Sequence, residues 1–195
     1  MDRRIEKTRK AIFDAFDALI AKFDYAKISV QNIINKAGVG RSTFYLHFTT
    51  KNDLLRAKCV DLFEHIFAPI GTETTHASSM KFTFEEKIMH ILYRLLDNKN
   101  VIKGILASEG RPIFLQYFRS YLVNTVENED VHFAEVPDIF LENHIAGSFI
   151  EMVCWWVNCD FSESPENLTR WFLCVLPTLS TNINDNRHLT LSKNI

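Results

Sequence analysis

The stretch from residue 29 to residue 48, SVQNIINKAGVGRSTFYLHF, decides the fold of the chain. Gly38 and Gly40 divide it into two segments, each long enough for about two helical turns. Ser29 can cap the first helix with its hydroxyl, Gly38 can take the positive φ that ends it, and Gly40 is an acceptable cap for the second. The stretch therefore predicts two short helices joined by a tight turn.

A longer helix upstream supplies a surface on which these short helices can pack. Helices this short bury too little surface to be stable alone, and residues 5–22 repeat apolar side chains with a helical period. The stripe of this predicted helix contains Ile12, Phe16, Leu19 and Phe23. The apolar positions of the two short helices are expected to face the same small core, and they are Val30, Ile33, Ile34, Ala37, Val39, Phe44 and Phe48.

The second short helix carries polar side chains on the face that points away from this core. A helix with such hydrogen-bond donors is narrow enough to enter the major groove of DNA. Residues 50–53 (TKND) then form a capping sequence, which places free N–H groups and Lys51 at the positive end of the next helix and predicts a phosphate site. The outward residues of the second short helix are Arg41, Ser42, Thr43, Tyr45 and His47. The alternative is that this helix face contacts only solvent.

Charge is distributed unevenly along the chain. The net charge is −2, but residues 1–58 hold 12 Lys and Arg against 6 Asp and Glu, a balance of +6, and the remaining residues carry −8. This asymmetry predicts that the N-terminal part alone binds a polyanion. A charged terminus is usually just a solvent-exposed end, which is the expectation here; the alternative is that Arg3 or Arg4 enters a minor groove as a basic arm.

Residues 5–55 resemble the DNA-binding domain of the TetR family of bacterial transcriptional regulators. The resemblance lies above all in residues 28–34 (ISVQNII), 37–48 (AGVGRSTFYLHF) and 51–55 (KNDLL). It implies an all-α fold, with a three-helix, helix-turn-helix DNA-binding domain over residues 1–50 and a helical ligand-binding and dimerisation domain over residues 51–195. It also implies a homodimer, with double-stranded DNA as its partner.

The resemblance implies roles for individual residues as well. Ser29 would add a phosphate contact, and Gly40 stands where a serine is common in the family, which removes one hydroxyl contact but not the fold. The residues that would face bases or nearby phosphates are Arg41, Ser42 and Thr43. Those that would hold the DNA backbone are Tyr45, His47 and Lys51.

The remainder of the chain is also predicted to be helical. It holds few glycines and prolines, and no long alternation of polar and apolar residues supports a strand. Polar loops are expected at residues 71–81 and 127–136, and a frayed tail after residue 181. Helices are expected over residues 51–67, 84–97, 101–107, 112–126, 137–158 and 165–176.

The composition, 47% apolar and 24% charged, is that of an ordinary globular protein. The longest apolar run, residues 152–157, is far shorter than the ~18 residues of a membrane span, and the N-terminus mixes charges where a signal peptide would be apolar. We therefore expect a cytoplasmic protein without membrane contact and with buried, reduced cysteines. No metal-binding spacing, phosphate-binding loop or catalytic motif occurs, so we expect no metal, no cofactor and no enzymatic activity.

Aromatic residues after residue 58 suggest an apolar cavity. Eleven of the 16 Phe lie there, and Tyr or His among them would supply the few polar groups that such a cavity needs. Taken singly, each residue is expected to belong to the core rather than to a ligand site, so the prediction is a cavity somewhere among these helices. The candidates are Phe63, Phe67, Met89, Leu92, Tyr93, Phe114, Tyr117, Phe118, His144 and Met152.

The last two predicted helices suggest a dimer interface. From residue 149 to residue 157 every residue but Glu151 is apolar, and neighbouring tryptophans on a helix point about 100° apart, so both cannot face one core. Residues 146–156, followed by Ser164-Pro165-Glu166, resemble the paired last helices of one TetR subgroup. The expected contacts of a two-fold four-helix interface are Trp155, Trp156, Leu168, Trp171 and Val175. The alternative is that both tryptophans complete a monomer core.

The sequence as a whole predicts a dimeric, ligand-responsive repressor that binds a pseudo-palindromic operator and responds to a small apolar effector. One alternative is a DNA-bound protein whose acidic part recruits a protein partner. A helical-bundle enzyme would need clustered carboxylates or histidines, and the sequence shows no such pattern.

Overall fold

The computed structural model describes residues 3–69, 82–129 and 136–176, and every element within these ranges is helical. The helix bounds lie within two residues of the expected ones. The expected loop at 71–81, most of the loop at 127–136 and the tail after 181 lie outside the described residues. The elements are α1 (Arg3–Ile20), the 3-10 helix η1 (Tyr25–Lys27), α2 (Val30–Ala37), α3 (Arg41–His47), α4 (Lys51–Ile66), α5 (Phe84–Asp97), α6 (Lys99–Leu106), α7 (Arg111–Glu127), α8 (Asp138–Asn158) and α9 (Pro165–Val175).

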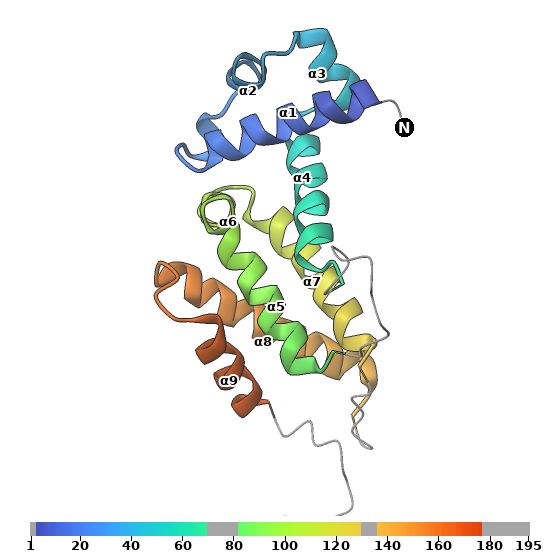
Figure 1. Ribbon diagram of the computed structural model, residues 1–195, viewed down its shortest axis with the longest axis vertical. Helices are drawn as coiled ribbons and strands as arrows, with labels where there is room; N and C mark the ends of the chain where they lie inside the picture. Colours follow the sequence, from blue (N-terminus) through green and yellow to red (C-terminus); the bar gives the residue numbers. More distant parts are fainter. Residues whose placement is uncertain (1–2, 70–81, 130–135, 177–195) are drawn as a thin grey trace, which may run out of the picture.

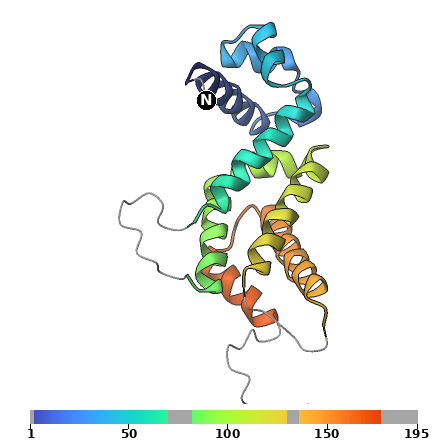
Figure 2. The ribbon, with the colours of Figure 1, turned by 90° about the vertical axis from the view of Figure 1, so that its right-hand side faces the viewer.

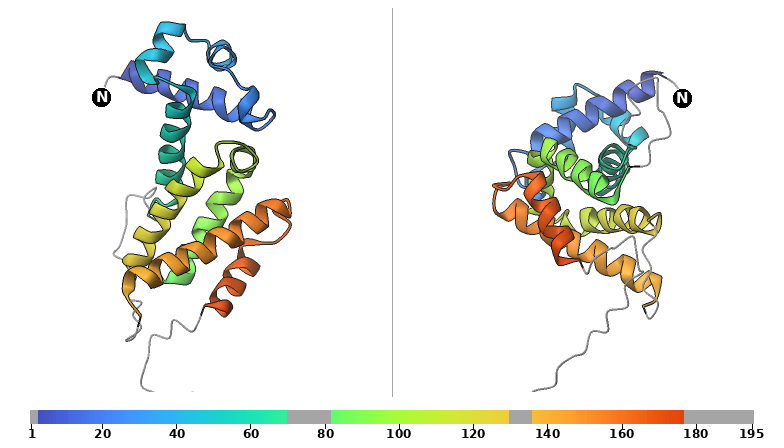
Figure 3. Two further views of the ribbon diagram at one scale, coloured as in Figure 1. Left: turned by 180° about the vertical axis from the view of Figure 1, so that it is seen from behind. Right: turned by 60° about the horizontal axis from the view of Figure 1, so that its bottom comes forward.

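The helices form two parts, a head made of α1–α3 and a body made of α5–α9 (Figure 1). α4 runs from the head into the body, as the view turned by 90° also shows (Figure 2). In the body, α7 packs against α4 and α8, and α5 packs against α9; the view from behind shows α7 and α8 next to each other (Figure 3). α6 contacts both α1 and α7. The head is thus joined to the body covalently through α4 and by packing through α6.

The head has an apolar core built by α1, α2 and α3. Burial of a large apolar side chain contributes about 1.5–3 kcal/mol, so α1 stabilises the two short helices. Phe23, expected on the stripe of α1, is instead 55% exposed, because α1 ends at Ile20 and the chain turns before it reaches Phe23. The fully buried side chains of this core include Ile12, Phe16, Ile33 and Phe44.

Two contacts fasten α1 to the helices that follow the head. Gly104 of α6 lies so close to α1 that a Cβ at this position would be 2.2 Å from the carbonyl oxygen of Ile20. Lys58 of α4 is buried, and its Nζ lies 2.9 Å from Asp17 of α1 and 3.3 Å from Asp61. Burial alone would lower the pKa of Lys58, but the two carboxylates raise it above its ordinary value. The ammonium therefore stays charged and holds α4 against α1.

The core of the body is rich in aromatic rings. Phe63 of α4 stacks on Phe118 of α7, with ring centroids 5.3 Å apart and planes inclined by 5°. Phe149 of α8 continues the cluster, 6.1 Å from Phe118 and 5.1 Å from Phe172 of α9. One set of contacts therefore links α4, α7, α8 and α9. None of the described helices is long and apolar enough to cross a membrane.

Candidate nucleic-acid interface

The turn between α2 and α3 has the geometry that its sequence predicts. Ser29 and Asn32 cap α2 reciprocally: the Asn32 N–H donates to Ser29 Oγ at 3.1 Å, and the Ser29 N–H donates to Asn32 Oδ1 at 2.9 Å. Gly38 has a φ of 66° and its N–H donates to the Ile34 carbonyl, a left-handed conformation that favours glycine. Gly40 caps α3 with extended backbone. The predicted helix-turn-helix is confirmed.

α3 turns one face to the core and the opposite face to solvent. Phe44 and the C-cap residue Phe48 are buried in the head, whereas Arg41, Ser42 and Tyr45 are exposed. Within the described part of the chain, the Arg41 guanidinium and the Tyr45 hydroxyl have no hydrogen-bond or ion-pair partner. These two groups are therefore free to bind an external acceptor.

The remaining positions of α3 complete this solvent face. Thr43 and His47 are partly buried and lie at its border. Leu46 is 85% exposed and contributes nothing to the apolar core. The sequence prediction considers only hydrogen-bond donors here and omits Leu46, although its helical spacing of four residues from Ser42 is a signal that places it on the same face.

Lys51, expected to hold the DNA backbone, is engaged by the protein itself. Its Nζ donates to the carbonyl oxygens of Tyr25 at 2.6 Å and Ile28 at 2.8 Å, and lies 4.0 Å from the centroid of the Tyr25 ring. Burial lowers the pKa of Lys51. The Tyr25 hydroxyl donates to Asn52 Oδ1 at 2.6 Å. Lys51 thus joins the segment before α2 to the first turn of α4, and two of its three N–H groups are already used.

The other expected phosphate contacts also have local partners. The Ser29 hydroxyl lies 2.6 Å from Asn32 Oδ1, to which it donates. At the start of α4, the Thr50 N–H donates to Asp53 at 3.0 Å, and Asp53 pairs with Arg56 at 3.2 Å. Arg3 and Arg4, the candidates for a basic arm, lie in the first turn of α1. Among the residues expected to contact DNA, Ser29 and Lys51 are therefore bonded within the chain, whereas Arg41 and Tyr45 on α3 keep polar groups without such a bond in the described part of the chain.

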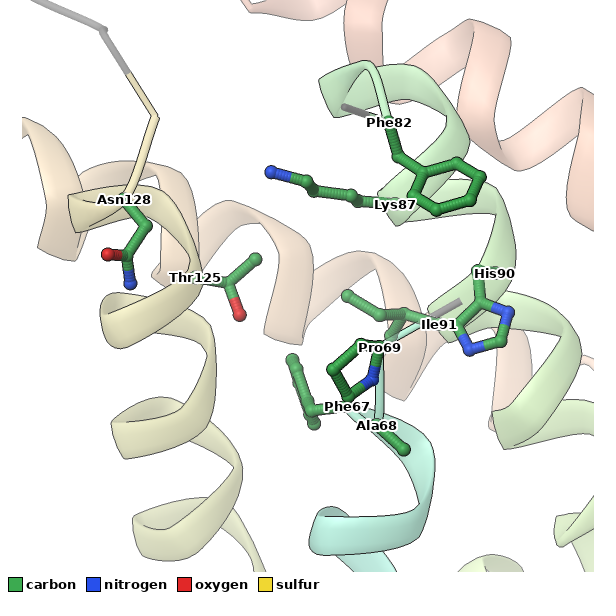
Figure 4. Close-up of a pocket in the computed structure, with 9 residues that line it drawn as sticks. All are labelled: Phe67, Ala68, Pro69, Phe82, Lys87, His90, Ile91, Thr125 and Asn128. Carbon is green, nitrogen blue, oxygen red and sulfur yellow. The ribbon is translucent and has the colours of Figure 1, made fainter. Parts of the chain in front are cut away.

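A cavity of about 340 Å³ lies between the end of α4, α5 and α7 (Figure 4). Lys87, His90, Thr125 and Asn128 supply its polar lining. Lys87 forms an ion pair with Glu129, and burial, with Arg94 nearby, lowers the pKa of His90. The volume lies in the range of small-molecule sites. The apolar lining comes from Phe67, Ala68, Pro69, Phe82 and Ile91.

Only Phe67 among the expected lining residues borders this cavity. Phe63, Phe114 and Phe118 are core residues, because their rings fill the space between α4 and α7, where Phe63 and Phe114 approach to 4.9 Å. Leu92 is also fully buried in the core, and Met89, Tyr117 and Met152 are partly buried. Tyr93 bonds to Glu166 on the surface and His144 stacks on exposed Phe140, so neither points into the cavity.

The expected dimer residues divide into two groups. Trp155 of α8 and Trp171 of α9 are 46% and 40% exposed, and their rings lie 6.4 Å apart. Val175 is also exposed, four residues after Trp171 on α9. Trp156 and Leu168 are fully buried inside the chain, which corrects their assignment to an interface. The Trp156 indole N–H donates to the Glu163 carbonyl at 2.9 Å. The described residues include no group of three His, Cys, Asp or Glu that could hold a metal ion.

Two family profiles match the chain. The profile described as bacterial regulatory proteins, tetR family, matches residues 12–57, which contain α2, α3 and the turn between them. A second profile, described as transcriptional regulator C-terminal region, matches residues 83–175. The two matched regions therefore correspond to the head with the start of α4 and to the body.

Three relatives extend this similarity over most of the chain. The crystal structure of a TetR transcriptional regulator from Streptococcus agalactiae 2603V is 38% identical, covers 89% of this chain and 95% of that chain, and has a TM-score of 0.69. The dihydroxyacetone kinase operon activator DhaS shares the fold, with 20% identity, coverage of 86% and 92%, and a TM-score of 0.64. YxbF, an HTH-type transcriptional regulator of Bacillus subtilis (strain 168), is 27% identical over 89% of this chain and 45% of its own length.

The chain spans about half the length of the curated relatives that it matches. The similarity to the Streptococcus agalactiae regulator, in contrast, includes both the helix-turn-helix and the helical body and extends over nearly all of that protein. Proteins of this kind are transcriptional regulators and not enzymes. The chain therefore belongs to the TetR family of bacterial transcriptional regulators.

Proposed function

We propose that the protein binds a pseudo-palindromic operator as a homodimer and represses transcription until a small effector releases it. The observation that carries the DNA-binding part is the solvent face of α3. It presents the Arg41 guanidinium and the Tyr45 hydroxyl without hydrogen-bond or ion-pair partners in the described part of the chain, while the opposite face is buried. Contact with base edges and phosphates requires free hydrogen-bond donors on a short helix that is packed firmly on the protein.

Dimerisation is supported by the exposed rings of α8 and α9. Trp155 and Trp171 form one aromatic surface that is 46% and 40% exposed in the described part of the chain, and large aromatic residues dominate the energy of protein interfaces. A two-fold axis through this surface would pair α8 and α9 of both protomers in a four-helix arrangement. Two heads of such a dimer would occupy successive major grooves, which lie roughly 34–36 Å apart.

The effector part rests on the position of the cavity. The cavity borders Phe67 and Pro69, just after α4, while the first turn of α4 contacts the head through Lys51. A ligand that fits one position of α4 better than another would shift the distance between the two heads. The expected ligand is a small, mainly apolar molecule with one or two polar groups that can hydrogen-bond to Lys87, Thr125 or Asn128.

DNA binding is tested with the full chain and duplexes selected from a random library, using fluorescence anisotropy. Arg41→Ala is expected to lower affinity at least about fivefold if its base contact is bidentate. Lys99→Ala, which removes an exposed cation from α6 instead, should keep wild-type affinity. Equal affinity for wild type and Arg41→Ala would contradict the proposal.

The sign of regulation and the effector need separate measurements. DhaS, which shares the fold, is named an activator, so the fold alone does not decide between activation and repression. If the protein is a repressor, a reporter fused to the operator will show lower expression with the protein than without it. Native mass spectrometry of the purified protein then tests for a bound apolar ligand. Higher expression in the presence of the protein would contradict repression while leaving DNA binding intact.

A further inference from the structure

We propose that Leu46 is a specificity-determining residue, which contacts the 5-methyl group of a thymine in the major groove. This inference deepens the proposed function and rests on it. Among the large hydrophobic residues described as exposed, Leu46 is the most exposed, at 85%. It lies on the solvent face of α3, one position after Tyr45 and four after Ser42.

Leu46 takes no part in the apolar packing of the described residues. The apolar side of α3 is already formed by Phe44 and Phe48, which are buried, and Leu46 belongs neither to the core nor to the residues packed against it. An isolated exposed leucine needs no explanation by itself. Here it lies on a face whose other exposed members, Arg41, Ser42 and Tyr45, are hydrogen-bond donors.

The surroundings of Leu46 indicate what covers it. Arg41, Ser42 and Tyr45 offer positive charge and donors, and the first 58 residues carry a balance of +6. The complementary surface is therefore anionic, rich in acceptors, and apolar at one point. The major groove of DNA has this pattern wherever a thymine methyl group lies beside phosphates and base acceptors. Leu46 would then select a T·A pair in each half-site.

The test removes single methyl groups from the DNA. An operator is first selected from random duplexes with the full-length wild-type chain, and each thymine is then replaced by deoxyuridine, which lacks only the 5-methyl group. Loss of one buried methyl contact should weaken wild-type binding about fourfold per half-site. Leu46→Ala should bind the unmodified operator more weakly by at least this factor, and the same deoxyuridine should no longer change its affinity. Leu46→Met, which keeps an apolar side chain, should retain the sensitivity.

Two controls make the result interpretable. Ile139→Ala removes another exposed aliphatic side chain, on α8, and should behave like wild type. Thermal unfolding should be unchanged in Leu46→Ala, since the side chain is 85% exposed, lies outside the apolar cluster of the described residues, and alanine is a good helix former.

Each outcome has a distinct meaning. If wild type binds its selected operator but tolerates every deoxyuridine, or if Leu46→Ala stays as sensitive as wild type, the role of Leu46 is refuted while DNA binding stands. If no duplex is selected, the proposed function fails first and the inference fails with it.

Discussion

Gly104→Ala should separate DNA affinity from folding, because Gly104 lies where the body meets the head. A Cβ at this position would be 2.2 Å from the oxygen and 3.0 Å from the carbon of the Ile20 carbonyl. Both atoms belong to the backbone, so no side-chain rotation relieves the overlap. Restoring ordinary van der Waals contact requires a relative shift of α1 and α6 by about 1 Å.

Two opposing terms set the effect of Gly104→Ala on stability. Overpacking costs about 1–3 kcal/mol, whereas alanine in a helix interior is favoured over glycine by about 1 kcal/mol. We therefore expect a net loss of at most about 2 kcal/mol. In the proposed dimer, the displacement occurs in both protomers and changes the distance between the two α3 helices. The affinity for a full operator should then fall at least tenfold.

The assay combines anisotropy titrations on the full operator with thermal unfolding of the same samples. Asn100→Ala is the matched control, because Asn100 is exposed on the same helix α6 and its replacement creates no overlap. This control should bind like wild type. Wild-type affinity and unfolding temperature in Gly104→Ala would refute the argument that close contact between α1 and α6 sets the position of the head.

Three further predictions concern single residues. Lys51→Met should lower the free energy of unfolding by about 1–3 kcal/mol, because it removes the donor to two carbonyl oxygens. The control Arg41→Met should leave the unfolding temperature unchanged, and a Lys51→Met variant as stable as wild type would show that the contact is dispensable. Burial lowers the pKa of His90 below its ordinary 6.5, so the contribution of His90 to stability should be full above about pH 6.5 and decrease as the pH falls below it. Chemical denaturation from pH 7.5 down to pH 5 should therefore show a smaller loss of unfolding free energy in His90→Gln than in wild type. The same pH dependence of unfolding free energy in both proteins would contradict this. Trp155→Glu should sediment as a folded monomer, because the Trp155 ring is about half exposed, whereas Trp156→Glu should fail to fold, because the Trp156 ring is fully buried. A dimeric Trp155→Glu would exclude the surface around Trp155 and Trp171 as the interface.

Helix positions were predictable because their signals are local. The caps at Ser29 and Thr50 and the left-handed Gly38 each depend on residues within one or two turns. The exposure of Arg41 and Tyr45 follows likewise from the burial of Phe44 on the opposite side of one short helix. Phe23 was misplaced because periodicity shows which side of a helix is apolar but not where the helix ends.

The environment of other residues depends on contacts between distant segments. Lys51 donates to carbonyls that precede it by 26 and 23 residues, and no local pattern indicates that these oxygens lie within reach. Spacing also cannot distinguish a phenylalanine that fills a core, such as Phe63, from one that borders a cavity, such as Phe67. For Trp155 and Trp156, the 100° rule required one ring to point outward but could not tell which one.

Regulation of DNA binding in this fold requires that the head respond to the body. α4 provides one connection, since Lys51 at its start contacts the head and Phe67 at its end borders the cavity. α6 provides a second, through the contact of Gly104 with Ile20 and the pair that Lys103 forms with Asp160, in the turn between α8 and α9. An effector that changes operator affinity tenfold needs only about 1.4 kcal/mol of difference between its two bound states. Under the proposed mechanism, a modest movement of α4 or α6 therefore suffices.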